Sequence, residues 1–491
     1  MIKIYTFFLV LAINSVFAQN VVFNDPDFKA LFIKPWYDTN NDGELSFAEA
    51  TAITSFSATT NVNINDLQGI EAFTNLQGIV IKNNNVSAPV DLTQNLNLKT
   101  LILWGSMTVL NITGLNQLEY ISVDGPFPVL DVINKPLLHT LFIDGAYVNG
   151  STTPVGVQQL NVAGSPLLTT LWSQGTSLTS LNLLNNSLLT QLVINGNQLT
   201  GIDLTGNPML NYLSIGGNPM TTLNVTQNPL LESLFAGNMG ITSINLQNNS
   251  LLKVLSLSYN IMAGGTIDIS NLTVLEDLDV FGCQLTSLDL TNNVSLKYLD
   301  ITNNYLPDMS FSNLSQLLWW KGHSNNFTSV DLSSNPVLNI ANFGNNQLLE
   351  YINLKNGNND NMQFHYTMFS WLPLLKGVCV DNSNSGYANS IRGTLPSTVI
   401  VTSNCAWLGT EELAVKSITP FYPNPSAELV YFKSSSRPLL YEIYAPTGQK
   451  VDAGKFRSGE NSIKVSHLTP GTYMVKVETE KGTLTGKVIK K

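Results

Sequence analysis

Five oxygen-bearing residues near the N-terminus have the spacing of ligands around one calcium ion. They lie within a single twelve-residue segment and are Asp38, Asn40, Asp42, Glu44 and Glu49. Calcium needs several oxygen ligands around one point, and oxygen side chains that alternate along a bending loop can supply them. Glu44 is expected to offer its backbone carbonyl, and Glu49 both oxygens of its carboxylate. The segment therefore predicts one structural calcium site, with a solvated Asx–Gly turn as the alternative.

The elements that must position these ligands are a sharp turn, an apolar anchor and a short helix before the loop. Gly43 stands at the sixth position, where the loop turns, and Leu45 at the eighth can anchor it in a core. Ser46 at the ninth position can act through water. The helix leading in is suggested by three apolar residues, Phe28, Leu31 and Phe32. The segment thus resembles the loop of an EF-hand. The sequence has no second such loop, which favours a structural ion over a calcium sensor.

Most of the chain is organised by a repeat. Between Leu189 and Asn260 the phrase L-x-x-L-x-L-x-x-N occurs twice in every 21 residues. The leucines of each L-x-L point to one side of a short strand, and the residue between them points to solvent. An asparagine in the following turn can bond to backbone groups that the turn leaves unpaired. The phrases end at Asn186, Asn197, Asn207, Asn218, Asn228, Asn249 and Asn260.

This phrase is that of the leucine-rich repeat, and the resemblance extends over roughly 300 residues. It resembles the variety in which both halves of a 21-residue unit contain the phrase, which leaves few residues for helices. The resemblance implies a mainly β solenoid with little helix and two strand-like faces. We expect an N-terminal cap with the calcium loop at 19–58, the solenoid at 59–376 and a small antiparallel β-sandwich at the C-terminus.

The two faces differ in their outward residues. Those of the second phrase are small and polar, which is typical of a solvated structural ladder. Those of the first phrase include nine aromatic residues: Trp104, Tyr120, Phe142, Trp172, Tyr212, Phe235, Phe281, Tyr298 and Trp319. Exposed aromatic rings reduce solubility and are typical of contact surfaces, so the row predicts a binding face. The alternative is that the rings only stack on one another along the sheet.

Three acidic residues, Asp277, Asp279 and Asp300, fall on the same face, and Asp279 and Asp300 are equivalent in successive coils. Paired carboxylates can hydrolyse glycosidic bonds, which makes a polysaccharide-active enzyme one alternative. Such residues are more often solvated ladder positions. The sequence contains no nucleophile elbow, zinc-protease motif or phosphate-binding glycine loop. We therefore expect a protein that is not an enzyme.

The end of the repeats is marked by two cysteines. Cys379 and Cys405 are expected to form a disulfide across a C-terminal cap at 377–405, which would shield the apolar end of the last coil. A linker at 406–416 follows. Cys283 stands where the repeat elsewhere has asparagine, so we expect it to be a buried free thiol.

The last segment, 417–491, is basic, with eleven Lys and Arg against six Asp and Glu. Alternating apolar runs predict a small antiparallel β-sandwich. Its motifs are Tyr422–Pro425, Tyr444–Gly448, Leu468–Tyr473 and Gly486–Lys491. With them the segment resembles the C-terminal sorting domain of the type IX secretion system of Bacteroidetes. The resemblance implies handling by that machinery and export across the outer membrane; an ordinary binding module is the alternative.

Residues 1–18 have the features of a secretory signal peptide, and no segment is long and apolar enough to span a membrane. The net charge of −10 argues against a nucleic-acid partner. Together these features predict a protein that travels through the periplasm and is secreted or held at the cell surface. Its expected function is binding or adhesion to a protein or glycan, and a purely structural surface component is the remaining alternative.

Overall fold

The computed structural model describes residues 19–59, 63–82, 85–144, 156–405, 421–422, 425–432, 437–445, 449–457, 459–480 and 482–491. The predicted signal peptide (1–18) and linker (406–416) lie outside the described residues. The chain divides into two compact units, Met1–Ser403 and Asn404–Lys491.

The first unit begins with a cap of two short helices, α1 (Pro26–Ala30) and α2 (Phe47–Ala52). Asp25 caps α1 through one carboxylate oxygen, which accepts hydrogen bonds from the N–H groups of Asp27 and Phe28. Its other oxygen accepts a hydrogen bond from Asn65 N at 2.7 Å. One carboxylate therefore joins the cap to the first coil.

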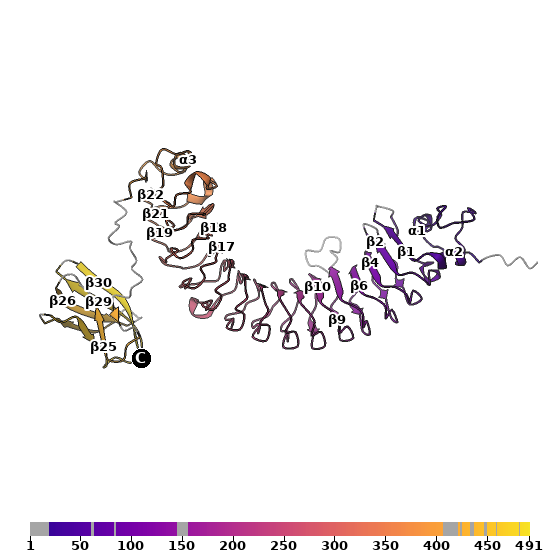
Figure 1. Cartoon of the computed structure of the whole chain (residues 1–491), viewed down its shortest axis with the longest axis horizontal. Helices are drawn as coiled ribbons and strands as arrows, with labels where there is room; N and C mark the ends of the chain where they lie inside the picture. The colour runs from indigo at the N-terminus through magenta and orange to yellow at the C-terminus, as the bar shows by residue number, and fades with distance from the viewer. Residues whose placement is uncertain are drawn as a thin grey trace, which may run out of the picture. The chain divides into compact units, whose positions relative to one another are not determined.

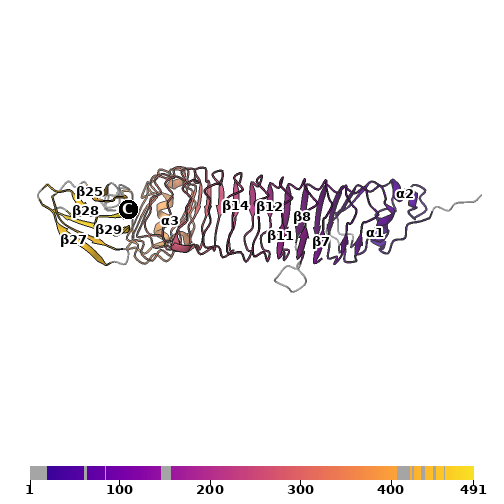
Figure 2. The same ribbon diagram turned by 90° about the horizontal axis from the view of Figure 1, so that it is seen from below.

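Parallel strands form one fourteen-stranded sheet along the concave side of the solenoid (Figure 1). The strands follow chain order, with one strand in each coil. Figure 2 shows the coils stacked side by side. They are β1 (Ser55–Ala58), β2 (Gly78–Ile81), β4 (Thr100–Trp104), β6 (Tyr120–Asp124), β8 (Thr140–Asp144), β10 (Thr170–Gln174), β12 (Gln191–Val193), β13 (Tyr212–Ser214), β14 (Ser233–Phe235), β15 (Val254–Ser256), β16 (Asp277–Asp279), β17 (Tyr298–Asp300), β18 (Trp319–Lys321) and β20 (Ile340–Asn342). Two 3₁₀ turns, η1 (Ile70–Ala72) and η2 (Ala263–Gly265), lie between strands.

The leucine at the centre of each strand packs on its equivalents in the neighbouring coils. Leu213 is paired in register with Leu192 and Leu234, and all three are fully buried. Burial of one such side chain contributes about 1.5–3 kcal/mol, so the stack is a continuous source of stability. In β18 the buried position holds Trp320, and the neighbouring Gly322 leaves room for its ring, which any side chain there would strike.

Buried asparagines connect each coil to the one before it. The Oδ1 atom of Asn218 accepts a hydrogen bond from Leu199 N at 3.1 Å, and its Nδ2 donates to Ile194 O at 3.0 Å and Ile215 O at 2.7 Å. Asparagines of the second phrase also donate to backbone carbonyls of the preceding coil; these include Asn186, Asn207, Asn228, Asn249, Asn293 and Asn335. The predicted use of asparagine is therefore confirmed.

Cys283 occupies an asparagine position and is a buried free thiol, as predicted. Its Sγ donates to Leu257 O at 3.2 Å, so the thiol replaces one of the hydrogen bonds that an asparagine would make. Burial raises the pKa of this thiol to about 11, which keeps it protonated at neutral pH.

The second face contains strands only toward the two ends of the solenoid. They are β3 (Val90–Asp91), β5 (Leu110–Asn111), β7 (Val129–Asp131), β9 (Gln159–Asn161), β11 (Ser180–Asn182), β19 (Ser329–Asp331), β21 (Tyr351–Asn353), β22 (Gly377–Cys379) and β23 (Ile400–Thr402). Residues 183–328 have no strand on this face. The outward Asn or Asp of the second phrase closes its own turn both here and where strands form, as at Asn182 and Asp331. Asp203 Oδ1, for example, accepts from Thr205 N at 2.9 Å. The expectation of two strand-like faces thus holds only in part. Between residues 183 and 328 the coils are connected on this side by side-chain bonds, such as that from Asn248 Nδ2 to Thr226 O at 3.0 Å, and not by strands.

The last coils of the first unit contain two 3₁₀ turns, η3 (Asn359–Asn361) and η4 (Tyr366–Phe369), and the helix α3 (Gly386–Thr394). Strands β22 and β23 continue the sheet of β19 and β21. Cys379 at the end of β22 and Cys405 are disulfide-bonded, which confirms the predicted pair.

The second unit is formed of two antiparallel sheets around its own core. One sheet has the order β24 (Phe421–Tyr422), β25 (Leu429–Phe432), β28 (Ser462–Lys464). The other has the order β27 (Lys450–Lys455), β26 (Pro438–Tyr444), β29 (Gly471–Thr479), β30 (Gly482–Lys490). Buried residues from both sheets, among them Phe432, Ile463, Ile443 and Val475, form one cluster, as in a β-sandwich.

Candidate functional site

The predicted calcium loop is folded by its own side chains. Asp38 is buried, and its two carboxylate oxygens accept hydrogen bonds from Asp42 N at 3.3 Å and Gly43 N at 3.1 Å. Asn40 Oδ1 accepts from Asp42 N at 3.0 Å, and Asp42 Oδ1 accepts from Glu44 N at 2.8 Å. Gly43 has a φ of 80°, the left-handed turn expected at this position. These bonds gather the oxygen side chains of the loop on one turn.

Glu49 lies beside this turn on the first turn of α2. Its Oε1 accepts from Thr39 N and Oγ1, both at 2.7 Å, and its Oε2 accepts from Ser46 N and Oγ, both at 2.9 Å. Burial by itself would raise the pKa of Glu49, but the hydrogen bonds from Ser46 and Thr39 outweigh it and lower the pKa to about 2. The carboxylate is therefore charged at neutral pH.

The oxygen donors of the loop suit a hard cation such as calcium, but their side chains do not form a coordination site in this conformation. Among the described residues, no three acidic, histidine or cysteine side chains are grouped to hold a metal. Asp38, Asn40, Asp42 and the backbone carbonyl of Glu44 would hold the ion, and Glu49 would join them by exchanging its bonds with Thr39 and Ser46. The side chain of Glu44 pairs with Lys29 Nζ at 2.6 Å, and the predicted ligand there is its backbone carbonyl.

The residues of the predicted binding face lie together on the concave side. All twelve stand on the outward side of the fourteen-stranded sheet or just beyond its strands, and each is at least partly exposed. Strand register sets their alignment. Phe142 is paired with Trp172, Asp279 with Asp300, and Tyr298 with Trp319. The repeat therefore places residues far apart in sequence on one continuous surface.

The aromatic rings of this face contact one another in short groups. Tyr120, Phe142 and Trp172 form a row with 5.9 Å between successive ring centroids. Two separate pairs are Tyr212–Phe235 at 5.5 Å and Tyr298–Trp319 at 5.2 Å. Trp172 and Trp319 nevertheless remain 37% and 42% exposed. The rings thus pack on one another, as the alternative interpretation predicted. Trp172 and Trp319 are nevertheless accessible to solvent.

The acidic residues of the face are held in separate interactions. Asp279 accepts from Ser256 Oγ at 2.8 Å, and Asp300 pairs with Lys321 Nζ at 3.1 Å. Burial raises the pKa of Asp277, with repulsion from Asp279 adding to it and Lys321 opposing it. Asp279 and Asp300 are therefore each held by a neighbouring side chain rather than by one another.

A second carboxylate pair escaped the sequence interpretation. Asp124 and Asp144 are paired in register on β6 and β8, next to Trp104. Burial raises the pKa of Asp124 to about 6, although a hydrogen bond from Gly105 N opposes the rise and Asp144 adds to it. The signal that could have found this pairing is its spacing, because Asp144 follows Asp124 by 20 residues and Asp124 follows Trp104 by the same 20.

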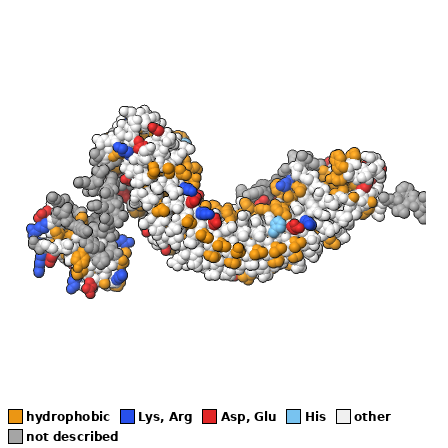
Figure 3. Space-filling view, in the orientation of Figure 1, with side chains coloured by type: hydrophobic (Ala, Val, Ile, Leu, Met, Phe, Trp, Pro, Cys, Tyr) orange, Lys and Arg blue, Asp and Glu red, His pale blue; other side chains and the backbone are white. Residues whose placement is uncertain are grey.

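A row of exposed apolar side chains also escaped prediction. It follows the turn before each strand and includes Leu137, Leu167, Leu188, Met209, Leu230, Leu251, Val274 and Val337. Figure 3 shows apolar side chains in rows along the solenoid. The leucine that follows each of them is buried, so composition alone does not show which of the two neighbouring apolar residues faces solvent.

Comparison with known proteins decides the nature of the second unit. Residues 420–491 match the secretion system C-terminal sorting domain. The match begins three residues after the predicted boundary at 417 and includes the four motifs named above. The β-sandwich of the second unit is therefore the sorting domain.

Solved structures show the fold of the first unit. The functional domain of InlJ from Listeria monocytogenes, described as including a cysteine ladder, is similar with a TM-score of 0.60 and 20% identity, over 96% of this chain and 98% of that one. A TDR receptor is similar with a TM-score of 0.50 and 15% identity, over 72% and 70% of the two chains. No curated protein matches the sequence. The solenoid therefore has the leucine-rich-repeat fold. No helix of the described residues is long and apolar enough to cross a bilayer.

Proposed function

We propose that this chain is an exported, non-enzymatic recognition protein that binds a protein ligand through its concave sheet. The observation that supports this most is the continuous outward surface of aromatic and charged residues on fourteen aligned strands. Such a surface combines half-buried rings, which lose little entropy on binding, with fixed charges that can orient a partner. Catalysis is disfavoured because Asp279 and Asp300 are committed to Ser256 and Lys321.

A protein ligand is favoured over a glycan at this surface because most of its rings contact a neighbouring ring. Phe142 is contacted by Tyr120 on one side and by Trp172 on the other. A sugar ring needs the open face of an aromatic ring, whereas a protein can also use ring edges and broad area. The mixed charges of Asp277, Asp300 and Lys321 suit a protein surface as well.

Export follows from the sorting domain. We infer that the type IX secretion machinery recognises 420–491 and moves the solenoid to the cell surface or the medium, after the signal peptide has taken it to the periplasm. An exported solenoid has access to extracellular protein partners, which agrees with the proposed role.

The double variant Trp172→Ala with Trp319→Ala should bind its ligand at least about tenfold more weakly than the wild type. These exposed rings are the type of anchor that dominates interface energies. The ligand would be found by screening the purified chain against protein and glycan arrays and measured by biolayer interferometry. Met209→Ala, an exposed change outside the sheet face, is the control. Turnover of a polysaccharide that is lost in Asp300→Asn would instead establish an enzyme.

Calcium should stabilise the first unit if the loop of Asp38–Glu49 binds it. At a free calcium concentration of a hundred times Kd, the free energy of unfolding should rise by about 2.7 kcal/mol. Differential scanning calorimetry with calcium and with EDTA measures the shift. Asp42→Asn should reduce it, because an amide keeps the hydrogen bond from Glu44 N and an oxygen ligand but lacks the charge. Equal melting temperatures for the wild type with calcium and with EDTA would refute the site.

A further inference from the structure

One column of the solenoid has left-handed backbone in nine successive coils. It runs along the edge of the concave sheet, just beyond the strand ends. The N–H of each member from Gly196 to Asn345 donates to a carbonyl of the next coil, and Trp371 follows Ser370, which accepts from Asn345. Its φ values lie between 53° and 69°. Its members are Gly196, Gly217, Asn238, Tyr259, Gly282, Asn303, Ser324, Asn345 and Trp371. We call this column the left-handed edge.

Two of its residues do not suit this backbone. Glycine tolerates positive φ without strain and asparagine tolerates it well, whereas a bulky residue there is an outlier. Tyr259 and Trp371 are the two large residues of the left-handed edge, with φ of 59° and 57°. Strain of this kind persists where the side chain serves a function, which makes both aromatic residues candidates for ligand contacts.

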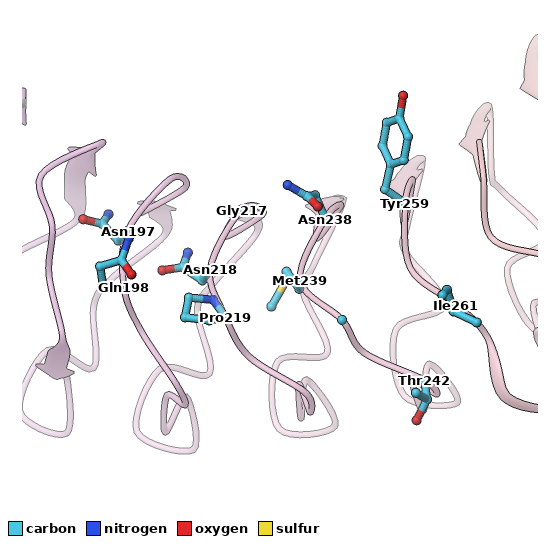
Figure 4. A pocket seen from close by; sticks show the side chains of 11 residues that line it. Asn197, Gln198, Gly217, Asn218, Pro219, Asn238, Met239, Thr242, Tyr259 and Ile261 are labelled. Carbon is cyan, nitrogen blue, oxygen red and sulfur yellow. The ribbon is translucent and has the colours of Figure 1, made fainter. Parts of the chain in front are cut away.

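Folding does not account for these side chains, because both are directed to solvent. Tyr259 is 60% exposed and Trp371 is 79% exposed. The Tyr259 ring rests on Phe281, with 4.8 Å between centroids, and Gly282 leaves the space beside it open. Figure 4 shows the Tyr259 ring projecting away from the coils. Phe281 therefore supports one side of the Tyr259 ring, and the ring projects into solvent, where a ligand can reach it.

The edge beside Tyr259 is hollowed and uncharged. A groove of about 690 Å³ reaches from Asn197 to Ile261 and is lined by amides, glycines and a few apolar side chains, and none of its lining residues is charged. Asn238 and Met239 lie between its two ends (Figure 4). From Tyr259 to Trp371 the left-handed edge presents Asn303, Ser324 and Asn345, which are also uncharged. These residues offer no charged group that could pair with the charges of a nucleic acid or a charged peptide.

We propose that the left-handed edge binds a neutral polysaccharide, with Tyr259 and Trp371 stacking on two of its sugar rings. A pyranose ring has an apolar C–H face that matches the negative face of an aromatic ring, and hydroxyl groups at its rim that match amides and hydroxyls. The two aromatic residues are five strand steps apart, about 24 Å at ~4.8 Å per step, so one extended chain can reach both. Tyr259 rests on Phe281 at the border of the protein-binding surface proposed above, but the polysaccharide proposal does not depend on that function.

The test uses variants that the fold already accommodates. Asparagine occupies the left-handed edge at Asn238, Asn303 and Asn345, so Tyr259→Asn and Trp371→Asn fit the same backbone. Affinity electrophoresis of the full chain in gels containing laminarin, a neutral glucan, or a neutral mannan gives the dissociation constants, with alginate as a charged polysaccharide. We expect retardation by at least one neutral polysaccharide, about tenfold weaker binding in each variant, and no retardation by alginate.

Controls separate this site from the others. Trp172→Ala, on the concave sheet, should leave polysaccharide binding unchanged, and Tyr259→Asn should melt at or above the wild-type temperature because it removes strain. The proposal is overturned by wild-type protein that ignores both neutral polysaccharides, by binding that survives Tyr259→Asn and Trp371→Asn together, or by binding that is lost in Trp172→Ala. A sharp fall in melting temperature in Tyr259→Asn would also overturn it, because the ring would then serve packing.

Discussion

Replacing Asn218 by alanine should lower the free energy of unfolding of the solenoid by about 3 kcal/mol or more. The change leaves the N–H of Leu199 and the carbonyls of Ile194 and Ile215 without their hydrogen-bond partner inside the stack. Each buried polar group left unpaired costs roughly 1–3 kcal/mol. The lost hydrogen bonds connect two coils, and a solenoid is stable only through contacts between neighbouring coils. Urea unfolding followed by circular dichroism measures it.

Gln227 supplies a matched control. It is an exposed amide on a nearby coil, and Gln227→Ala should change the free energy of unfolding by less than about 0.5 kcal/mol. Equal urea midpoints for Asn218→Ala and Gln227→Ala would show that the buried asparagines do not hold the coils together. The chain already accepts Met239 and Cys283 in the same column, so the variant should still fold.

Removal of residues 417–491 should abolish export almost completely. In a bacterium with a type IX secretion system, the truncated chain should accumulate in the periplasm and be absent from the cell surface and the medium. Immunoblots of the separated fractions measure this. The solenoid has its own hydrophobic core, distinct from that of the sorting domain, so the trapped protein should retain its circular dichroism spectrum.

Two neighbouring residues of β29 provide a finer test of the same point. Val475 is buried in the core of the sorting domain, and Met474 is exposed beside it. Val475→Asp should block export because an unpaired carboxylate in that core unfolds the domain. Met474→Asp places the same group in water and should leave export intact. Surface display of the chain that lacks 417–491 would rule out the sorting role.

Much of the fold could be predicted from spacing alone. Leu213 and its equivalents recur at a fixed interval, and that interval requires stacked coils with the leucines inside. Asn218 recurs in the turn that follows, where an amide can satisfy backbone groups. The convex side was less predictable, since nothing local in Asp203 or Asn224 indicates whether its coil forms a strand there.

The candidate sites were predictable to unequal degrees. The loop of Asp38–Glu49 is contiguous, so its turn could be anticipated, but the bonds that hold Glu49 to Thr39 and Ser46 could not. The alternation of inward and outward residues along each strand predicted that Trp172 and Trp319 lie on the surface of the concave sheet. Whether their faces are free or covered depends on ring orientations in neighbouring coils, which composition does not specify.

The sequence by itself determined the repeat period, the inward leucines, the disulfide and the sorting domain, because each depends on short-range spacing or on a contiguous motif. Only the tertiary structure brought Tyr259 and Trp371 to one edge. Trp371 follows Asn345 by 26 residues, whereas Asn345 follows Ser324 by 21. The register of such unequal coils is set by backbone hydrogen bonds between them, and these form only when the coils stack.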